Sequence, residues 1–164
     1  IPYDGDSIYI DNTSISSISE EVMRNTIVYV DQKIKLINGS IKDNIFMGDL
    51  FDEKAVSVAM INDMLKENKI NYDYQIDNTN SNLSGGQISK IAIAQAFNSK
   101  RDLIIFDETT SNLDSDSEAK ILRNIKQNYK DKTIILITHR KSNTEYFNKI
   151  ITFKDGKIIK FQGG

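Results

Sequence analysis

The chain has 164 residues, of which 39% are hydrophobic and 27% are charged, and its formal net charge is -2. This composition is typical of a globular protein with one domain or a domain and a subdomain, and the absence of a basic excess disfavours a nucleic-acid partner. The sequence contains no cysteine, which excludes disulfides, a thiolate nucleophile and a zinc–thiolate site.

Hydrophobic periodicity and turn residues predict the elements of the first part of the chain. Ser84 is expected to cap a helix that runs to about Phe97, because a serine hydroxyl satisfies the free amides of a first helical turn. The other predicted elements are, in chain order, strands at 7–11 and 27–30, helices at 41–47 and 52–68, and a polar loop at 71–82.

The sequence pattern of the second part of the chain predicts a parallel sheet. Residues 103–106 (LIIF) and 133–137 (TIILI) are apolar throughout, as in strands covered by helices on both faces. An amphipathic helix is expected at 115–129, and the strands 150–153 and 157–161 flank Asp155-Gly156, a hairpin signal. This alternation predicts an open α/β sheet whose ligands lie at the carboxyl ends of the strands.

Polar residues follow three of the predicted strands. Asp107 and Glu108 directly follow the strand LIIF, where one carboxylate can hold Mg2+ and the next can orient an attacking water. The alternative is that they merely end a strand at the surface. Gln32 follows IVYV and His139, the only histidine, follows TIILI; each could equally be structural.

Ser84-Gly85-Gly86-Gln87 places a hydroxyl and two glycine amides at a predicted helix N-terminus. Such an arrangement binds anions, because the amides point outward and the helix dipole favours negative charge. The alternative is an ordinary helix cap, although a cap does not require two adjacent glycines.

The order of these pieces resembles the ATP-binding-cassette (ABC) ATPases, the nucleotide-binding domains of ABC transporters. Gln32 is followed by LSGGQ at 83–87, LIIFDE at 103–108, SNLD at 111–114 and then His139. The resemblance runs from about Gly5 to Gly163. It implies a P-loop NTPase α/β core (1–36 and 98–164) of three layers with an inserted α-helical signature subdomain (37–97).

The resemblance also implies a role for each matched residue. Catalysis would rest on Glu108, which polarises water, and on the switch histidine His139. Asp107 and Gln32 would bind Mg2+, and Asp114 would couple two cassettes packed head to tail. Ser84, Gly85, Gly86 and Gln87 would contact the γ-phosphate of ATP held by the opposite cassette.

The family also has a glycine-rich loop ending in Gly-Lys-Ser/Thr, the Walker A motif, and this sequence does not contain it. Ile1 to Gly5 resembles the segment after the Walker A helix, so the sequence is expected to be a cassette cut there, with a gap beside its central strands. Because that loop cradles the phosphates, this fragment is expected to bind MgATP weakly and not to hydrolyse it.

The segment LINGSIKDNIFMG at 36–48 resembles the exporter pattern of the family, and TNSNLSGGQ at 79–87 resembles exporters of peptides, bacteriocins and lipids. Together they imply a bacterial exporter of the peptide, bacteriocin or multidrug type. The implied partners are a second cassette and a transmembrane domain, at the cytoplasmic face of the membrane. Asn78, Lys90 and Gln95 depart from the family pattern. Two alternatives remain: a degenerate cassette that only dimerises or regulates, and a soluble cassette protein without a transport role.

Overall fold

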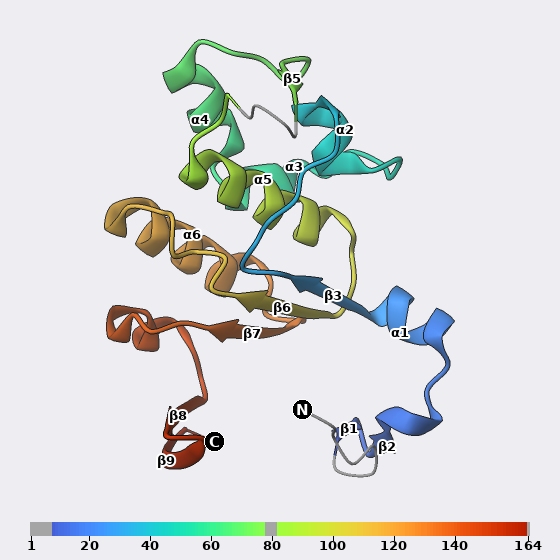
Figure 1. The fold of residues 1–164 in the computed structure, drawn as a ribbon, viewed down its shortest axis with the longest axis vertical. Helices are drawn as coiled ribbons and strands as arrows, with labels where there is room; N and C mark the ends of the chain where they lie inside the picture. The colour runs from blue at the N-terminus through green and yellow to red at the C-terminus, as the bar shows by residue number, and fades with distance from the viewer. Residues whose placement is uncertain (1–7, 78–81, 164) are drawn as a thin grey trace.

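A parallel sheet lies at the centre of the molecule (Figure 1). The computed structural model describes residues 8–77 and 82–163. The sheet contains β3 (Ile27–Val30), β6 (Leu103–Asp107) and β7 (Thr133–Ile137), in the order β3-β6-β7. The pairing aligns Val30 with Phe106 and Phe106 with Leu136, so the three carboxyl ends meet at one edge.

The helices α5 (Gly85–Asn98) and α6 (Ser115–Asn128) share one hydrophobic core with the buried side chains of β6. Phe97 of α5 is fully buried and lies with its ring centroid 4.3 Å from Tyr129 and 5.9 Å from Phe106. Removing such rings from water is the main stabilising contribution to the core.

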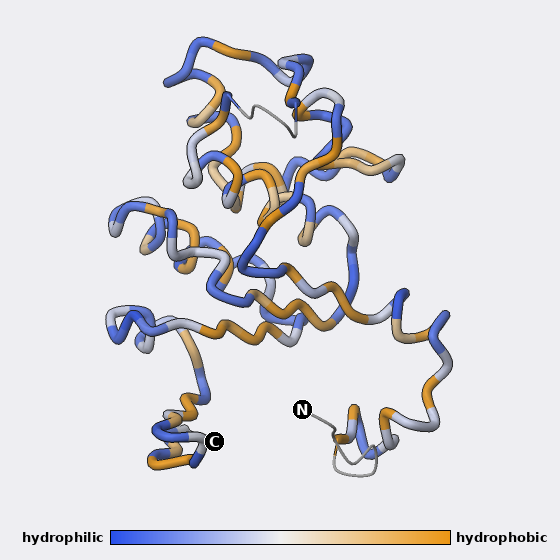
Figure 2. Tube along the Cα trace, viewed as in Figure 1, coloured by the Kyte–Doolittle hydropathy of each residue, from blue (hydrophilic) through white to orange (hydrophobic). Residues whose placement is uncertain are grey.

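The opposite face of the sheet is exposed in the described part of the chain. Tyr29, Ile135 and Ile137 are 53%, 44% and 47% exposed, although Figure 2 shows β6 and β7 as apolar along their length. Helices were predicted to cover both faces of these strands. Among the described residues they cover only one face. Period-2 alternation sends every second side chain of β7 to the exposed face.

The segment between β3 and β6 is mainly helical. It contains β4 (Gly39–Ser40), α2 (Ile41–Phe46), α3 (Glu53–Val58), α4 (Ile61–Asn68), β5 (Gln75–Ile76) and α5. The predicted helix at 52–68 is two helices, because Met60 has a left-handed backbone (φ 57) that turns the chain. The predicted loop at 71–82 includes β5, which pairs with β4. The division of the chain into two units stays a prediction.

Short elements complete the chain. The helix α1 (Glu20–Thr26) was not predicted, although Ser19 followed by two glutamates is a capping signal, and the Ser19 hydroxyl accepts a hydrogen bond from the Val22 amide. The remaining elements are β1 (Tyr9–Ile10), β2 (Thr13–Ser14), η2 (Ile15–Ser17), η3 (Lys141–Tyr146), β8 (Ile150–Lys154) and β9 (Lys157–Gln162). None of the described helices is long and apolar enough to cross a bilayer.

Candidate functional site

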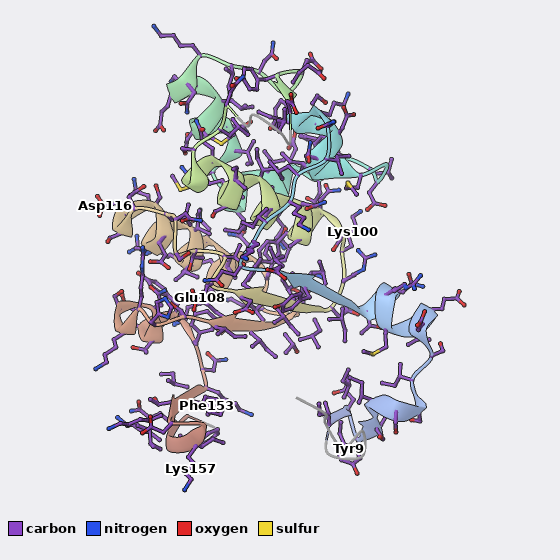
Figure 3. All side chains as sticks on the ribbon, in the orientation of Figure 1. Tyr9, Lys100, Glu108, Asp116, Phe153 and Lys157 are labelled. Atoms are coloured by element: carbon purple, nitrogen blue, oxygen red, sulfur yellow. The ribbon has the colours of Figure 1, made fainter. Side chains whose placement is uncertain are left out.

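Three predicted site residues meet at the carboxyl edge of the sheet, where Figure 3 labels Glu108. Gln32 follows β3, Glu108 follows β6 and His139 follows β7. The Gln32 side-chain amide donates a hydrogen bond to Glu108 Oε2 at 2.7 Å, and His139 Nδ1 lies 3.3 Å from Glu108 Oε1. Glu108 is therefore held from both sides by the ends of the neighbouring strands.

The backbone also fixes Glu108. Its φ is 48, a left-handed conformation that costs a residue with a side chain about 1–3 kcal/mol and persists only when its surroundings hold it. The Glu108 amide donates to the Ile137 carbonyl at 3.0 Å, and the Thr109 hydroxyl donates to the Val30 carbonyl at 3.2 Å. These bonds turn the carboxylate out of the strand, and the side chain remains 22% exposed and accessible to water.

Asp107 has a partner that sequence reasoning missed. The Tyr29 hydroxyl donates a hydrogen bond to Asp107 Oδ2 at 2.6 Å, and this bond, with a smaller contribution from desolvation, raises the pKa of the Tyr29 phenol from 10.0 to about 12. The available signal was period-2 alternation in IVYV, which places Tyr29 on the face opposite Val28 and Val30. The phenol stays neutral at physiological pH and orients one carboxylate oxygen.

The oxygen atoms at this edge suit Mg2+. Magnesium takes one or two carboxylates and keeps several waters or substrate oxygens, so it does not need a cage made of protein alone. Asp107 and the side-chain carbonyl of Gln32 are hard oxygen ligands of that kind. Residues 8–77 and 82–163 contain no group of three or more acidic or histidine side chains able to hold a metal by themselves.

The predicted anion site at 84–87 forms the start of α5. The Ser84 hydroxyl accepts a hydrogen bond from the Gln87 amide at 3.3 Å, and Gln87 Oε1 accepts one from the Ser84 amide at 2.6 Å. The capping alternative is therefore correct for these two side chains. It does not exclude an anion site, because the amides of Gly85 and Gly86 occupy the first turn, where helical geometry gives them no acceptor.

The two glycines have a packing role. A Cβ atom on Gly85 would lie 3.1 Å from Asn112 Cγ, and one on Gly86 would lie 3.2 Å from the Asn112 carbonyl oxygen. The absence of side chains thus lets the start of α5 approach the loop 111–114 closely. This explains why two glycines stand where a cap alone needs none.

The start of α5 and the loop 111–114 line one cleft of about 470 Å³. Asp114 lies in it and caps α6, its carboxylate accepting a hydrogen bond from the Ser117 amide at 2.8 Å. Hydrogen bonding to Ser117 lowers the pKa of the Asp114 carboxyl. Lys90, a departure from the family pattern, is 9% exposed and also lines this cleft.

The predicted residues thus form two groups. One contains Gln32, Asp107, Glu108 and His139 at the sheet edge; the other contains Ser84 to Gln87 and Asp114 around the cleft. Gln95 lines a separate cleft beside β3, and Asn78 lies outside the described residues. Sequence reasoning also missed Arg140, whose side chain contacts the loop 111–114.

Comparison with known proteins gives consistent matches. The family model described as ABC transporter matches residues 1–111. The sublancin-168-processing and transport ATP-binding protein SunT of Bacillus subtilis (strain 168) is 34% identical over 158 residues, covering 94% of this chain and 22% of the relative. The lactococcin-A transport/processing ATP-binding protein LcnC of Lactococcus lactis subsp. lactis is 36% identical over 160 residues, with 94% and 22% covered.

A solved structure agrees with these relatives. A bacterial Atm1-family ABC exporter with ATP bound matches with a TM-score of 0.84 and 27% identity, over 94% of this chain and 28% of that one. This confirms the predicted P-loop NTPase fold of an ABC cassette. The chain spans 22% of the length of the first curated relatives it matches. Because the family model covers 111 consecutive residues that include the signature helix and the strand before Asp107, the chain belongs to the ABC transporter family.

Proposed function

We propose that this chain is the ATP-hydrolysing part of a bacterial ABC exporter and powers transport across a membrane. The observation that carries the proposal is the contact of Glu108 with both Gln32 and His139 at the carboxyl ends of the central strands. A carboxylate held between a hydrogen-bond donor and an imidazole, and still open to solvent, is suited to orient a water for attack on a phosphoryl group.

The chemistry assigned to the residues is phosphoryl transfer to water. Glu108 accepts a hydrogen bond from the attacking water and aligns it, while Gln32 and His139 restrict the rotation of the carboxylate. Mg2+, held through Asp107 and Gln32, would supply positive charge beside the phosphate oxygens. Preorganised groups of this kind stabilise the developing charge without rearranging during the reaction.

A second copy of the cassette is the partner that the cleft favours. Ser84 and Gly85 are exposed, and the first-turn amides of α5 border a cleft that also contains Asp114. We assign this surface to ATP held by an opposing cassette, packed head to tail, with Asp114 coupling the two sites. An exposed helix N-terminus lined by glycines can meet a phosphate without steric interference.

A transmembrane domain is the other proposed partner, which would place the chain at the cytoplasmic face of a membrane. A second cleft, of about 780 Å³, lies beside the strand that leads to Gln32 and is lined by residues of β3, the 31–35 segment and α5. Apolar Met47 at its margin is 55% exposed. A membrane-domain helix bound in this cleft could displace Gln32, and the hydrogen bond from Gln32 would pass that displacement to the carboxylate of Glu108.

The test is Glu108→Gln in the complete protein that contains this chain. The amide keeps the shape of the side chain but removes the charge that aligns water, so turnover should fall by about 100-fold or more while ATP binding is retained. Glu21→Gln, at an exposed position on α1, is the matched control and should hydrolyse ATP normally. Near-normal hydrolysis by Glu108→Gln would remove Glu108 from its role.

We further propose that the 164-residue sequence by itself binds MgATP weakly, because it contains no Gly-Lys-Ser/Thr loop to cradle phosphates. ATP hydrolysis by this sequence should be compared with that of a longer form carrying such a loop. Micromolar ATP affinity in the 164-residue form would refute the proposal. If neither form hydrolyses ATP at concentrations that favour dimers, the degenerate cassette becomes the better interpretation.

A further inference from the structure

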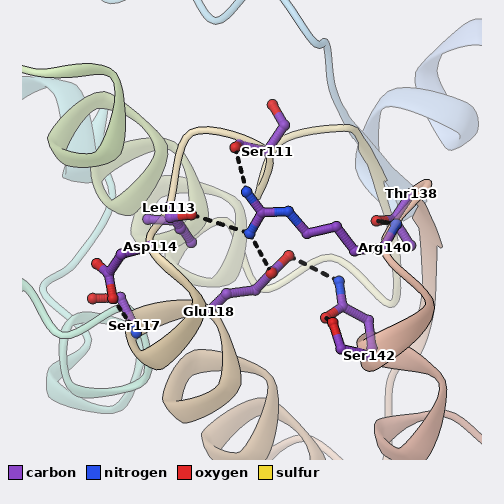
Figure 4. Close-up of polar contacts among 9 residues, drawn as sticks. Ser111, Leu113, Asp114, Ser117, Glu118, Thr138, Arg140 and Ser142 are labelled. Carbon is purple, nitrogen blue, oxygen red and sulfur yellow. Dashed lines mark hydrogen bonds and ion pairs between the residues drawn. The ribbon is translucent and has the colours of Figure 1, made fainter.

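One side chain joins the segment after β7 to the loop 111–114 (Figure 4). The guanidinium of Arg140 donates to the Ser111 carbonyl through Nη2 at 2.7 Å and to the Leu113 carbonyl through Nη1 at 3.1 Å. The same Nη1 donates to Glu118 Oε2 at 2.6 Å. Arg140 therefore holds two carbonyls of the loop and a carboxylate of α6 at once.

The carboxylate at the centre of this network is buried and fully engaged. Glu118 is 2% exposed, and its second oxygen, Oε1, accepts a hydrogen bond from the Asn143 side-chain amide at 2.8 Å. Asn143 itself is 3% exposed. A buried carboxylate is tolerated when it has a partner of opposite charge and its remaining hydrogen-bonding capacity is satisfied, and here both oxygens of Glu118 have donors.

Arg140 lies between the two groups of predicted site residues. It directly follows His139, the residue in contact with Glu108, and its backbone amide donates to the Thr138 hydroxyl at 3.0 Å, which fixes the turn after β7. The loop that it holds leads into Asp114, which caps α6 and lines the cleft at the start of α5. One guanidinium thus connects the two groups of predicted site residues.

We propose that Arg140 is a positioning residue that makes the His139 segment and the loop 111–114 move as one unit, so that occupancy of the signature cleft is transmitted to the water-aligning carboxylate. This rests on the proposed function, because it assigns a partner ATP to that cleft. The contacts of the Arg140 side chain are with Ser111, Leu113 and Glu118, so it acts on Glu108 through the backbone segments that it joins.

The competing explanation is a purely structural ion pair with Glu118. Arginine and lysine distinguish the two, because lysine can pair with Glu118 but has one nitrogen and cannot form the planar fork that reaches both loop carbonyls. Arg140→Lys should therefore keep the fold and lose the link. Arg123→Ala, which removes an exposed arginine from α6, is the matched control.

The experiment measures kcat and KM for ATP in the complete protein, with the thermal midpoint and hydrogen–deuterium exchange of residues 108–114. In Arg140→Lys we expect kcat to fall about 10-fold or more with KM within about two-fold, because misplaced catalytic groups lower the rate of the chemical step rather than ground-state binding. Exchange in 108–114 should become faster at an unchanged thermal midpoint. Arg123→Ala should change neither.

A double-mutant cycle provides the sharper readout. If Arg140 acts through the loop, the effects on kcat of Arg140→Lys and Asp114→Ala will not add, whereas independent sites are additive. A kcat of Arg140→Lys within two-fold of the unaltered protein, or additive effects, would overturn the proposal. If the unaltered protein does not hydrolyse ATP, the proposed function fails independently of Arg140. The role of Arg140 is then tested by hydrogen–deuterium exchange alone, and unchanged exchange of residues 108–114 in Arg140→Lys refutes the link.

Discussion

Adding a methyl group to either glycine of the signature helix should fail to stabilise the protein, although alanine is the better helix former. Gly85 and Gly86 are adjacent and both lie in the first turn of α5 with ordinary helical backbones. Alanine is favoured over glycine by about 1 kcal/mol in a helix. A new Cβ on Gly85 would meet Asn112 Cγ at 3.1 Å, which can rotate away, and also Asn112 Cβ at 3.2 Å, which moves only with the backbone of the loop. Overpacking against such an atom costs about 1–3 kcal/mol, so after the helical gain Gly85→Ala should lower the free energy of unfolding by about 0–2 kcal/mol.

At Gly86 the new Cβ would meet the backbone carbonyl of Asn112 at 3.2 Å, which can move only if the whole loop moves. Overpacking against a fixed neighbour costs about 1–3 kcal/mol, so after the helical gain Gly86→Ala should lose about 0–2 kcal/mol. Urea unfolding of both variants beside the unaltered protein measures these losses directly. A gain of about 1 kcal/mol in either variant would show that the loop adapts freely and that the close approach does not fix it.

Three further predictions concern the core, a helix cap and a phenol. Phe97→Ala should lose about 3–5 kcal/mol in urea unfolding, because the ring is fully buried, whereas Phe161→Ala, at a 60% exposed position on β9, should change stability by less than about 1 kcal/mol. Hydrogen bonds from the Ser40 hydroxyl and amide lower the pKa of the Asp43 carboxyl, so their contribution to stability is present above the ordinary aspartate pKa of 3.8 and is lost as the pH falls through the lower folded value. The thermal midpoint should show this loss below pH 3.8, and Asp43→Asn should remove the pH dependence. The hydrogen bond to Asp107 raises the Tyr29 pKa, so its stabilisation is complete below pH 10.0 and is lost as the pH rises toward 12; absorbance titration should find a phenol ionising near 12 that Tyr29→Phe abolishes.

The sequence predicted the elements that carry a strong local signal. The strands β3 and β7 have the predicted bounds, and β6 extends the predicted strand by one residue. Short, continuous apolar runs between polar ends are typical of buried strands, so the sequence specifies where they begin and end. The helix after Ser84 was predicted because its cap and its first turn are adjacent in sequence. The break between α3 and α4 was not, because the left-handed Met60 carries no glycine or proline signal.

The candidate site was predictable where strand ends align and unpredictable where partners are distant in sequence. Parallel pairing alone brings Gln32, Glu108 and His139 to one edge once the strands are known. The bond from Tyr29 to Asp107 joins residues separated by 78 positions, and the one from Arg140 to Ser111 joins residues separated by 29. Nothing in the local pattern specifies such pairs, because they depend on which side chains the sheet and α6 place within a few ångströms of each other.

The loop 111–114 is held from two independent directions. On one side the side-chain-free start of α5 packs against Asn112, and on the other the guanidinium of Arg140 binds the carbonyls of Ser111 and Leu113. A loop fixed on both sides can transmit a displacement that a loop fixed on one side would absorb. If the start of α5 shifts when it meets a phosphate, the loop must shift with it, and the arginine carries that shift to the backbone beside His139. The combination Gly86→Ala with Arg140→Lys disrupts both attachments. Hydrogen–deuterium exchange of residues 111–114 should therefore be faster in the double variant than in either single variant. If the double variant exchanges no faster than Arg140→Lys alone, the contact between Gly86 and the loop does not restrain the loop.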